Sequence, residues 1–574
     1  MRGADLIVEL LIQHGVKHIF GVPGDTSMAF HDALRLRQKE ITHILCRDER
    51  HAAYAADAYA RMTGRIGVVE VPSGGGALYV VPGVSEADLS NIPLLCIASD
   101  ITMSSDETYA LTDCHQEALF AAVTKWNTKL RLLSKIPQMM RKAVRVSTSG
   151  SPGAVALSFP ENLLRGEYDG KPEEIYGNPD HGRLGYFQND ATDEDVERAI
   201  ELMKQSKRPV MLAGGGVHFS KAYDELTQLV EKYNIPVVSS IDGKGSVAET
   251  KDYALGTIGA NGGSLEANEV ISQADFIFVL GCKLDNVTTV GKSIFAPGVK
   301  ILQVDINEQT LGNIAPISHG IMCDIRHLLV KLNKRDCGID KEAAAAWQEI
   351  WAAKRQEKMD RIGADYDKTS DYVVAAKVFG AVEKFTDGQA IFTGDAGTPT
   401  PYIASYIKMK QTGKHTVIPR AHGALGYAMG AAIGAQVARP QSRVVSFFGD
   451  ASFAMTMGEL ETAKRLNLPI VFVNFQNNSY GWIKTIQHLY YDQQYFGVDF
   501  CPIDTVMVSQ GFGIKAKNVT KNEDVESAVQ WALSLQEPVL LNFVIEPPDA
   551  FVPPVQQWEV DARKDPSDRK KLVY

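Results

Sequence analysis

The sequence predicts an α/β protein made of three doubly wound domains, each built on a parallel sheet. Apolar runs of roughly four to eight residues alternate with helix-period segments along most of the chain, which is typical of strands buried on both faces of a parallel sheet. In addition, the chain has 574 residues, more than one hydrophobic core normally serves. Polar stretches interrupt the alternation, and they mark the expected boundaries between domains.

The first domain is expected over residues 1–165. It opens with an amphipathic helix, ADLIVELLIQHG, whose internal Asp and Glu do not fit a secretory signal. The strand candidates follow as KHIFGV, ITHILC, IGVVEVP, IPLLCIA and GAVALSFP, with helices such as HAAYAADAYARM between them. The polar, Gly- and Pro-bearing residues 161–190 then predict a linker that crosses the surface.

Two further domains are expected over residues 190–335 and 365–550. The middle domain has the strand candidates RPVMLAGGG, IPVVSSID, FIFVLGC and KILQVDI, and a long charged helix, KEAAAAWQEIWAAKRQEKMDRIGADYD, leads onward. The last domain has QAIFTGD, RVVSFFGD, PIVFVNF and PVLLNFVI. Residues 551–574 combine Pro with many charges, which predicts a tail laid over the body of the protein.

Charge and cysteine content argue against several classes of function. Lys and Arg number 59 against 69 Asp and Glu, and no dense basic stretch occurs, so neither nucleic acid nor an anionic membrane surface is an expected partner. No apolar stretch reaches membrane-spanning length. Seven cysteines without a CxxC pair predict reduced, buried thiols and a cytoplasmic protein.

Oxygen-bearing side chains follow two neighbouring strands of the last domain. Asp450 ends VVSFFGD, and Asn477 and Asn478 end PIVFVNFQNN. Because ligands collect beyond the carboxyl ends of parallel strands, these side chains are expected at one sheet edge. Their oxygens suit Mg²⁺ with a phosphate. Taken alone, however, Asp450 is equally well explained as a helix cap and the Asn pair as a turn.

This pattern resembles the signature of thiamine-diphosphate enzymes of the acetolactate synthase, pyruvate oxidase and 2-oxo acid decarboxylase family. That family has Gly-Asp-Gly or Gly-Asp-Ala followed by Asn, and here Asn477 lies 27 positions after Asp450. Anchoring NNSYGWIKTIQ on Gly481 makes Asp450, Asn477 and the Ser479 carbonyl the implied metal ligands. The alternative anchoring gives Asn478 and Tyr480. The first is preferred because it keeps the family's spacing.

The resemblance extends over nearly the whole chain and implies a pyrimidine-binding, a middle and a diphosphate-binding domain. RDERHAAYAADAYARMTG matches the segment whose Glu, here Glu49, shares a proton with the coenzyme's pyrimidine ring. Burial raises a carboxyl pKa and strengthens such a hydrogen bond. PRAHGALGYAMGAAIG matches the segment whose bulky residue, here Leu425, bends the coenzyme, while the Gly423 carbonyl accepts from its amino group. The remaining implied coenzyme contacts are Gly397, Thr398, Gly449, Asp450, Ala451, Ser452, Asn477, Tyr480, Gly481 and Trp482.

Further catalytic candidates come from matches to different members of the family. HQEALFAAVTKWN resembles acetolactate synthase, where Gln116 would lie near the coenzyme, but the substrate-selecting Trp of that enzyme falls on Ile486. FGVPGD resembles pyruvate decarboxylase, which makes Asp25 a candidate for proton transfer. The paired His of that enzyme is absent, and His115 or His422 would have to substitute, although a lone His is more often structural.

Together these features predict a thiamine-diphosphate- and Mg²⁺-dependent enzyme that cleaves or forms a carbon–carbon bond of a 2-oxo acid or related ketone. Two alternatives remain open: a flavin-linked oxidase of the pyruvate oxidase type, and a catalytically silent coenzyme-binding subunit. LAGGGVHFS allows FAD in the middle domain, but a redox role is not favoured. The family builds each site between two chains, so a homodimer or homotetramer is expected.

Overall fold

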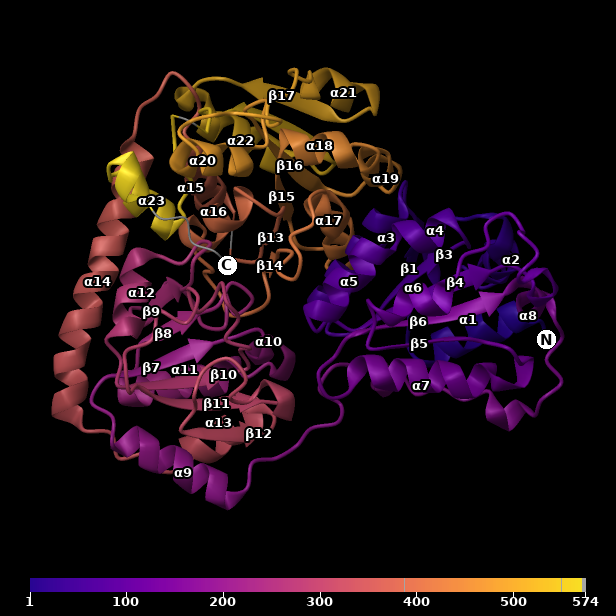
Figure 1. Cartoon of the computed structure of the whole chain (residues 1–574), viewed down its shortest axis with the longest axis horizontal. Helices are drawn as coiled ribbons and strands as arrows, with labels where there is room; N and C mark the ends of the chain where they lie inside the picture. Colours follow the sequence, from indigo (N-terminus) through magenta and orange to yellow (C-terminus); the bar gives the residue numbers. More distant parts are fainter. Residues whose placement is uncertain (387, 549, 570–574) are drawn as a thin grey trace.

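The protein consists of three α/β domains, described in a computed structural model over residues 1–386, 388–548 and 550–569. Each domain contains one six-stranded sheet. The named strands pair in parallel throughout the described chain, so the predicted fold class is confirmed. In Figure 1 the N-terminal domain (indigo) lies on one side, and the middle and C-terminal domains are stacked on the other.

The N-terminal sheet has the strand order β2-β1-β3-β4-β6-β5. Its strands are β1 (His18–Gly21), β2 (Thr42–Leu45), β3 (Gly67–Val71), β4 (Leu94–Asp100), β5 (Trp126–Lys129) and β6 (Ala154–Pro160). Its helices are α1 (Gly3–Gln13), α2 (Met28–Leu36), α3 (Glu49–Thr63), α4 (Gly75–Tyr79), α5 (Val81–Leu89), α6 (Gln116–Ala121), α7 (Ile136–Thr148) and α8 (Glu161–Arg165).

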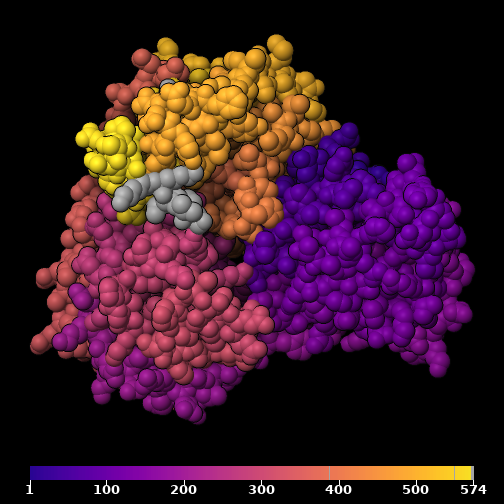
Figure 2. Space-filling view, in the orientation of Figure 1, coloured from indigo at the N-terminus to yellow at the C-terminus, as the bar shows by residue number. Residues whose placement is uncertain are grey.

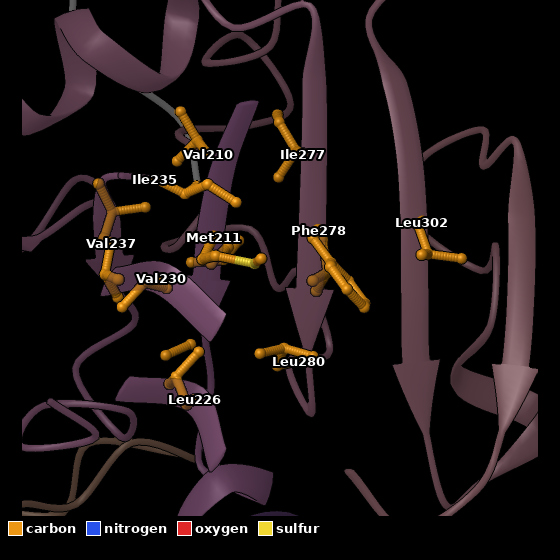
Figure 3. Packing of buried hydrophobic residues seen from close by; sticks show 14 of the residues in the cluster. Val210, Met211, Leu226, Val230, Ile235, Val237, Ile277, Phe278, Leu280 and Leu302 are labelled. Atoms are coloured by element: carbon orange, nitrogen blue, oxygen red, sulfur yellow. The ribbon is translucent and has the colours of Figure 1, made fainter. Parts of the chain in front are cut away.

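The middle sheet has the order β12-β11-β10-β7-β8-β9, which is the order of a dinucleotide-binding sheet when its strands are numbered along the chain. Its strands are β7 (Pro209–Ala213), β8 (Val237–Ser239), β9 (Ala254–Thr257), β10 (Phe276–Leu280), β11 (Lys300–Asp305) and β12 (His319–Met322). Its helices are α9 (Asp193–Lys204), α10 (Gly216–Ser220), α11 (Tyr223–Tyr233), α12 (Leu265–Ser272) and α13 (Ile325–Asn333). Figure 3 shows apolar side chains of β7, β10 and β11 gathered in its core.

The C-terminal sheet, ordered β14-β13-β15-β16-β18-β17, repeats the topology of the N-terminal sheet. Its strands are β13 (Ile391–Gly394), β14 (Thr416–Val417), β15 (Val444–Gly449), β16 (Ile470–Gln476), β17 (Lys515–Val519) and β18 (Val539–Val544). Its helices are α15 (Ala375–Phe385), α16 (Pro399–Tyr406), α17 (Tyr427–Ala438), α18 (Asp450–Thr456), α19 (Glu459–Arg465), α20 (Gly481–Tyr490), α21 (Thr505–Gly511) and α22 (Val525–Ser534).

The helices α14 and α23 connect or cover the domains and are not counted with any of the three sheets. The predicted charged helix is α14 (Lys341–Asp367), which runs along the edge of the molecule from the middle to the C-terminal domain (Figure 1). In the predicted tail, Trp558 of α23 (Gln556–Ala562) and Val555 just before this helix pack against Leu489 of α20. Figure 2 shows this segment (yellow) lying on the surface of the C-terminal domain. Residues 570–574 of the predicted tail lie outside the described residues.

Candidate active site

Asp450 joins the ends of two neighbouring strands. It is the first residue of α18, directly after β15, and is 3% exposed. One carboxylate oxygen accepts from the backbone N–H groups of Asn477 at 3.0 Å and Asn478 at 2.6 Å, just beyond β16. The other accepts from Ala451 N–H at 3.0 Å. Burial nevertheless raises the pKa of the Asp450 carboxyl to about 6, because the charged form loses its water.

The turn after β16 presents several oxygens to the same edge. The side-chain oxygen of Asn477 accepts from the N–H of Ser479 at 3.3 Å and from its hydroxyl at 3.2 Å. Asn478, at φ 56°, is turned differently: its side-chain oxygen accepts from Gln476 at 3.0 Å. The Tyr480 carbonyl is occupied by the first hydrogen bond of α20, from Lys484 N–H at 2.9 Å.

The turn after β13 faces the one after β16. Gly397 has φ +88°, and a Cβ placed there would lie 3.8 Å from Cβ of Trp482. Thr398, Asn477 and Gly481 line one small cavity of about 30 Å³. The structure therefore brings the two predicted coenzyme-binding turns together, although they are about eighty positions apart in the chain.

Leu425 lies on an open loop before α17. Its side chain is 39% exposed. Gly423 has φ +66°, and no atom lies within 4 Å of a Cβ placed there. Gly426 has φ +82°, and its N–H lies 3.1 Å from each carboxylate oxygen of the buried Asp395. Asp395 therefore fixes the loop on its buried side.

Glu49 is the first residue of α3, at the carboxyl end of β2. Its side chain is half-buried, and Oε1 lies 3.2 Å from the position that a Cβ of Gly76 would occupy. Burial raises the pKa of Glu49, and the neighbouring carboxylates of Asp48 and Glu70 add to the rise. Asp48 caps the helix by accepting from Arg50 N–H at 2.8 Å, which leaves the Glu49 carboxyl free of that task.

The other catalytic candidates, Gln116, His115, Asp25 and His422, make no contact with Glu49 among the hydrogen bonds of the described residues. Gln116 is buried and donates to the Ser99 carbonyl at 2.8 Å, while its side-chain oxygen has no partner among the described residues. His115 is exposed before α6, and Asp25 is exposed in the turn after β1. His422 contacts the Pro82 carbonyl at 2.9 Å. Within residues 1–386, 388–548 and 550–569, none of these side chains hydrogen-bonds to Glu49.

Three family models of thiamine pyrophosphate (thiamine diphosphate) enzymes match the chain. They describe the N-terminal coenzyme-binding domain at residues 1–119, the central domain at 196–332 and the C-terminal coenzyme-binding domain at 395–543. A probable acetolactate synthase large subunit of Methanocaldococcus jannaschii is 31% identical over 96% of this chain and 94% of its own length. The chain belongs to the thiamine pyrophosphate enzyme family.

Further relatives agree with this family assignment. A probable acetolactate synthase large subunit of Methanococcus aeolicus is 30% identical over 96% of this chain and 94% of its own length. The acetolactate synthase isozyme 2 large subunit of Escherichia coli is 29% identical over 95% and 96%. The protein is thus a thiamine-diphosphate-dependent enzyme similar to acetolactate synthase. In the described part of this enzyme, no helix combines the length and apolar character needed to cross a membrane.

The N-terminal and C-terminal domains of this thiamine pyrophosphate enzyme meet through α3 and α17. Gly434 packs so closely on α3 that a Cβ there would lie 1.9 Å from the Ala55 carbonyl oxygen. Beside this contact, the Tyr427 hydroxyl donates to the buried carboxylate of Asp57, which also pairs with Arg61 at 2.9 Å. The middle of α3, the helix that begins at Glu49, is thereby attached to α17, the helix that follows Leu425.

Two buried glutamates reinforce the same contact. Glu459 of α19 accepts from Arg47 N–H at 2.9 Å and contacts His51 at 3.2 Å. Glu86 of α5 accepts from the N–H groups of Arg420 at 2.8 Å and Ala421 at 3.1 Å. Each glutamate reaches from one domain to the other and satisfies backbone groups that would otherwise be buried without a partner.

Sequence reasoning did not single out Asp395, which the structure reveals as a central support of the site. It follows β13 as Asp450 follows β15, is 1% exposed, and accepts from Gly426 and Ala396 N–H groups and from Ser452. Burial raises its pKa to about 6. The signal was present in IFTGD, since a carboxylate at a parallel strand's end marks a ligand edge.

Proposed function

We propose that the enzyme cleaves or forms the carbon–carbon bond next to the carbonyl of a 2-oxo acid, using thiamine diphosphate and Mg²⁺. The observation that carries this proposal is the convergence of three segments. Asp450 is hydrogen-bonded to the turn of Asn477, that turn faces Gly397, and Ser452 contacts Asp395, which holds the loop of Leu425. The named activity of the relatives supports the substrate class.

The hydrogen bonding favours Asp450, Asn477 and Ser479 as Mg²⁺ ligands over the alternative set. The Asn478 side-chain oxygen accepts from Gln476 at 3.0 Å. The carbonyls of Ser479 and Tyr480 each accept one backbone N–H, from Gly481 at 2.8 Å and Lys484 at 2.9 Å, so the asparagine side chains are what distinguish the two sets. The Asn477 side-chain oxygen, by contrast, accepts only from Ser479 among the described residues, and the Asn477 N–H donates to the buried Asp450 carboxylate. Hard oxygen ligands with a phosphate in the remaining positions are what Mg²⁺ prefers.

The remaining site residues leave space in which the coenzyme could bind. Gly397 and Gly423 adopt positive φ values and leave space where a side chain would stand. The exposed face of Leu425 would support the bend, and Thr398, Gly449, Ala451, Ser452, Tyr480, Gly481 and Trp482 would surround the diphosphate side. When bound, the coenzyme supplies the nucleophilic carbon. The half-buried Glu49 would hold a proton against the pyrimidine nitrogen, since its raised pKa favours sharing that proton.

The test is a product assay. We expect the protein, given thiamine diphosphate, Mg²⁺ and a panel of 2-oxo acids, to release CO₂ and to form a 2-hydroxy-3-oxo acid or a decarboxylated product, observed by NMR. Ile486 stands where acetolactate synthase has its substrate-selecting Trp, and it packs with Leu489 and Trp558 beneath the tail. The panel of 2-oxo acids therefore has to identify the preferred acceptor substrate. Tight coenzyme binding without any product would instead identify a silent subunit.

A cavity between the three domains favours a second candidate, the flavin-linked oxidase. This cavity of about 920 Å³ is lined on its middle-domain side by Gly215 and Gly216 after β7, Gly281 after β10 and Asp305 at the end of β11. It therefore lies at the point where the strand order reverses, the usual place for a dinucleotide. A yellow protein that reduces its flavin when given a 2-oxo acid would support the oxidase; a colourless one that binds no added FAD would dismiss it.

A homodimer or homotetramer is the assembly we propose. In a single chain, large apolar side chains are exposed on both domains that hold the candidate site: Leu78, Tyr79, Tyr109 and Leu111 on one, Leu425, Ile483 and Phe496 on the other. Such surface is usually covered by a partner. We also propose a cytoplasmic location, because five of the seven cysteines are buried as free thiols. Light scattering and cell fractionation test these two proposals.

A further inference from the structure

A polar cluster away from the coenzyme site occupies the face of the N-terminal sheet that α2 covers. Nε2 of His31, on α2, lies 2.9 Å from Oε1 of Glu70, on β3. Nε2 of His43, on β2, lies 3.1 Å from the same oxygen. Glu70 is 1% exposed, and the two imidazoles are 17% and 16% exposed, so the cluster has a sealed floor and a narrow opening.

The backbone makes room for this cluster. β1 lies between β2 and β3, and its Gly21 is the register partner of Glu70. A Cβ at Gly21 would lie 2.3 Å from Oε1 of Glu70, so only glycine lets the carboxylate fold across β1 toward His43. The surrounding face is otherwise apolar, with Ile19, Phe30 and Val68 in its core.

In its present surroundings the carboxylate is incompletely satisfied. Oε1 faces both imidazoles, but the buried Oε2 has no hydrogen-bond partner among the described residues. A buried carboxylate without full partners is unfavourable in an apolar face, where an apolar side chain would pack without this cost. The buried Oε2 of Glu70 is therefore available as a ligand atom, in addition to a ring nitrogen of each histidine.

The donor set and its spacing match a borderline transition-metal ion. Three atoms from His31, His43 and Glu70 lie within 4.8 Å of one another. Tetrahedral zinc, with bonds of about 2.0–2.1 Å, requires ligand separations of about 3.3 Å, only a few tenths of an ångström beyond the two contacts above. Imidazole nitrogens suit Zn²⁺ far better than Mg²⁺. Three protein ligands and an opening to water form a complete zinc shell.

We infer that His31, His43 and Glu70 bind one divalent ion of the Zn²⁺ class, separate from the Mg²⁺ proposed at Asp450. The ion would tie α2 and the edge strand β2 to β3. From β3 the chain runs into Pro72, whose ring lies under Gly24 and Gly76, the latter beside Glu49. The ion would thus brace the base of the loop that faces Glu49 without touching the coenzyme.

The test is zinc titration of the full-length protein, freed of metal by chelation and then saturated with Mg²⁺ and thiamine diphosphate. We expect calorimetry to detect one Zn²⁺ per chain, and zinc to raise the melting temperature. His31→Ala, His43→Ala and Glu70→Gln should each weaken binding at least about tenfold. His327→Ala, on α13 with a side chain 39% exposed, and Cys501→Ser should bind as the wild type does, which excludes scattered surface ligands.

A second measurement does not depend on the variants folding. X-ray absorption of the wild-type zinc complex should show two imidazoles in a shell of nitrogen and oxygen, and Co²⁺ in its place should give the strong visible bands of a tetrahedral site. The inference is overturned if the wild type takes up no zinc under these conditions. It is equally overturned if the bound zinc has no imidazole ligand, or if folded variants bind it unchanged.

Discussion

The surroundings of the Glu49 carboxyl group raise its pKa above that of an exposed glutamate, which favours the protonated form. This carboxyl group is half-buried, and Asp48 and Glu70 disfavour a further negative charge nearby. Replacing it by the isosteric amide keeps the size of the side chain but removes the proton that is shared. We therefore expect Glu49→Gln to lower turnover by about 10²–10⁴-fold while coenzyme binding persists, as measured by steady-state kinetics and calorimetry.

A matched control is Glu40→Gln, whose carboxylate is on the surface of the same domain in an ion pair with Arg37. That variant should retain wild-type turnover, since surface pairs contribute little. Near-wild-type turnover of Glu49→Gln would remove Glu49 from the acid–base chemistry and leave it as a residue of the α3 start.

His218 gives stability a pH dependence of known sign. It is buried with Nε2 3.1 Å from the Lys244 carbonyl, to which it donates, and Nδ1 3.0 Å from the Tyr223 hydroxyl, which can donate to a neutral ring. Burial lowers its pKa well below 6.5. Below about pH 6.5, the ordinary pKa of histidine, the unfolded chain binds a proton at His218 that the folded chain does not. Stability from this group is therefore fully present above about pH 6.5 and falls as the pH is lowered, by up to about 1.4 kcal/mol per unit.

Melting temperatures of the wild type and His218→Gln at pH 7.5 and 5.5 test this sign. The glutamine variant is destabilised at the higher pH by its altered hydrogen bonds, but it should lose less on acidification than the wild type. Equal losses would mean that the folded protein accommodates a charged His218.

Among single residues, those placed at strand ends by simple periodicity were the easiest to find. Asp450 and Asn477 follow long apolar runs, so their meeting was predictable, and the structure brings them within hydrogen-bonding distance. The supports Asp395, Glu86 and Glu459 were not predicted. Asp395 could have been found by its place at the end of a strand, but Glu86 and Glu459 owe their importance to contacts with backbone groups far away in the chain, which no local pattern encodes.

At the scale of elements, the central strands and the edge strand β2 were recognised, and the other edge strands were missed. The five strands absent from the sequence interpretation are β5, β9, β12, β14 and β17, and each lies at the edge of its sheet. An edge strand needs no continuous apolar run because part of it faces solvent: β17 is mostly exposed, and β5 is WNTK. Length adds to the difficulty, since β14 has two residues.

The contact between α3 and α17 depends on Gly434, because glycine has no side chain at the point where the two helices touch. At Gly434, a Cβ would meet the Ala55 carbonyl oxygen at 1.9 Å, and backbone on both sides leaves little freedom to adjust. We expect Gly434→Ala to destabilise the protein by about 1–3 kcal/mol, as overpacking typically does, and to lower the melting temperature in calorimetry.

Gly363→Ala is the matched control for this helix contact. Gly363 is also inside a helix, α14, but no atom lies within 4 Å of a Cβ built on it. There the same substitution should be neutral or stabilise by about 0.4–1 kcal/mol, because alanine restricts the unfolded chain. If both variants melted alike, close packing of α3 on α17 would not be what holds the two domains together.

At the scale of the whole molecule, the repeated topology of the outer domains explains how one coenzyme can be held from two sides. Both sheets have the same strand order, and each ends a strand with a carboxylate-bearing turn, at Glu49 and Asp450. In one chain these domains are joined through α3 and α17, yet Leu425 stays open to solvent. A second chain that covers this surface would complete the site.

Complementation between two inactive variants distinguishes a site shared by two chains from a site within one chain. Glu49→Gln would damage the pyrimidine side and Asp450→Ala the metal side. When the two are co-expressed, half of the dimers are mixed, and if sites form between chains, one of the two sites in each mixed dimer carries neither substitution. Activity should then recover to about a quarter of the wild-type value. If each site lies within one chain, every site carries one substitution, and the mixture should stay as inactive as its components.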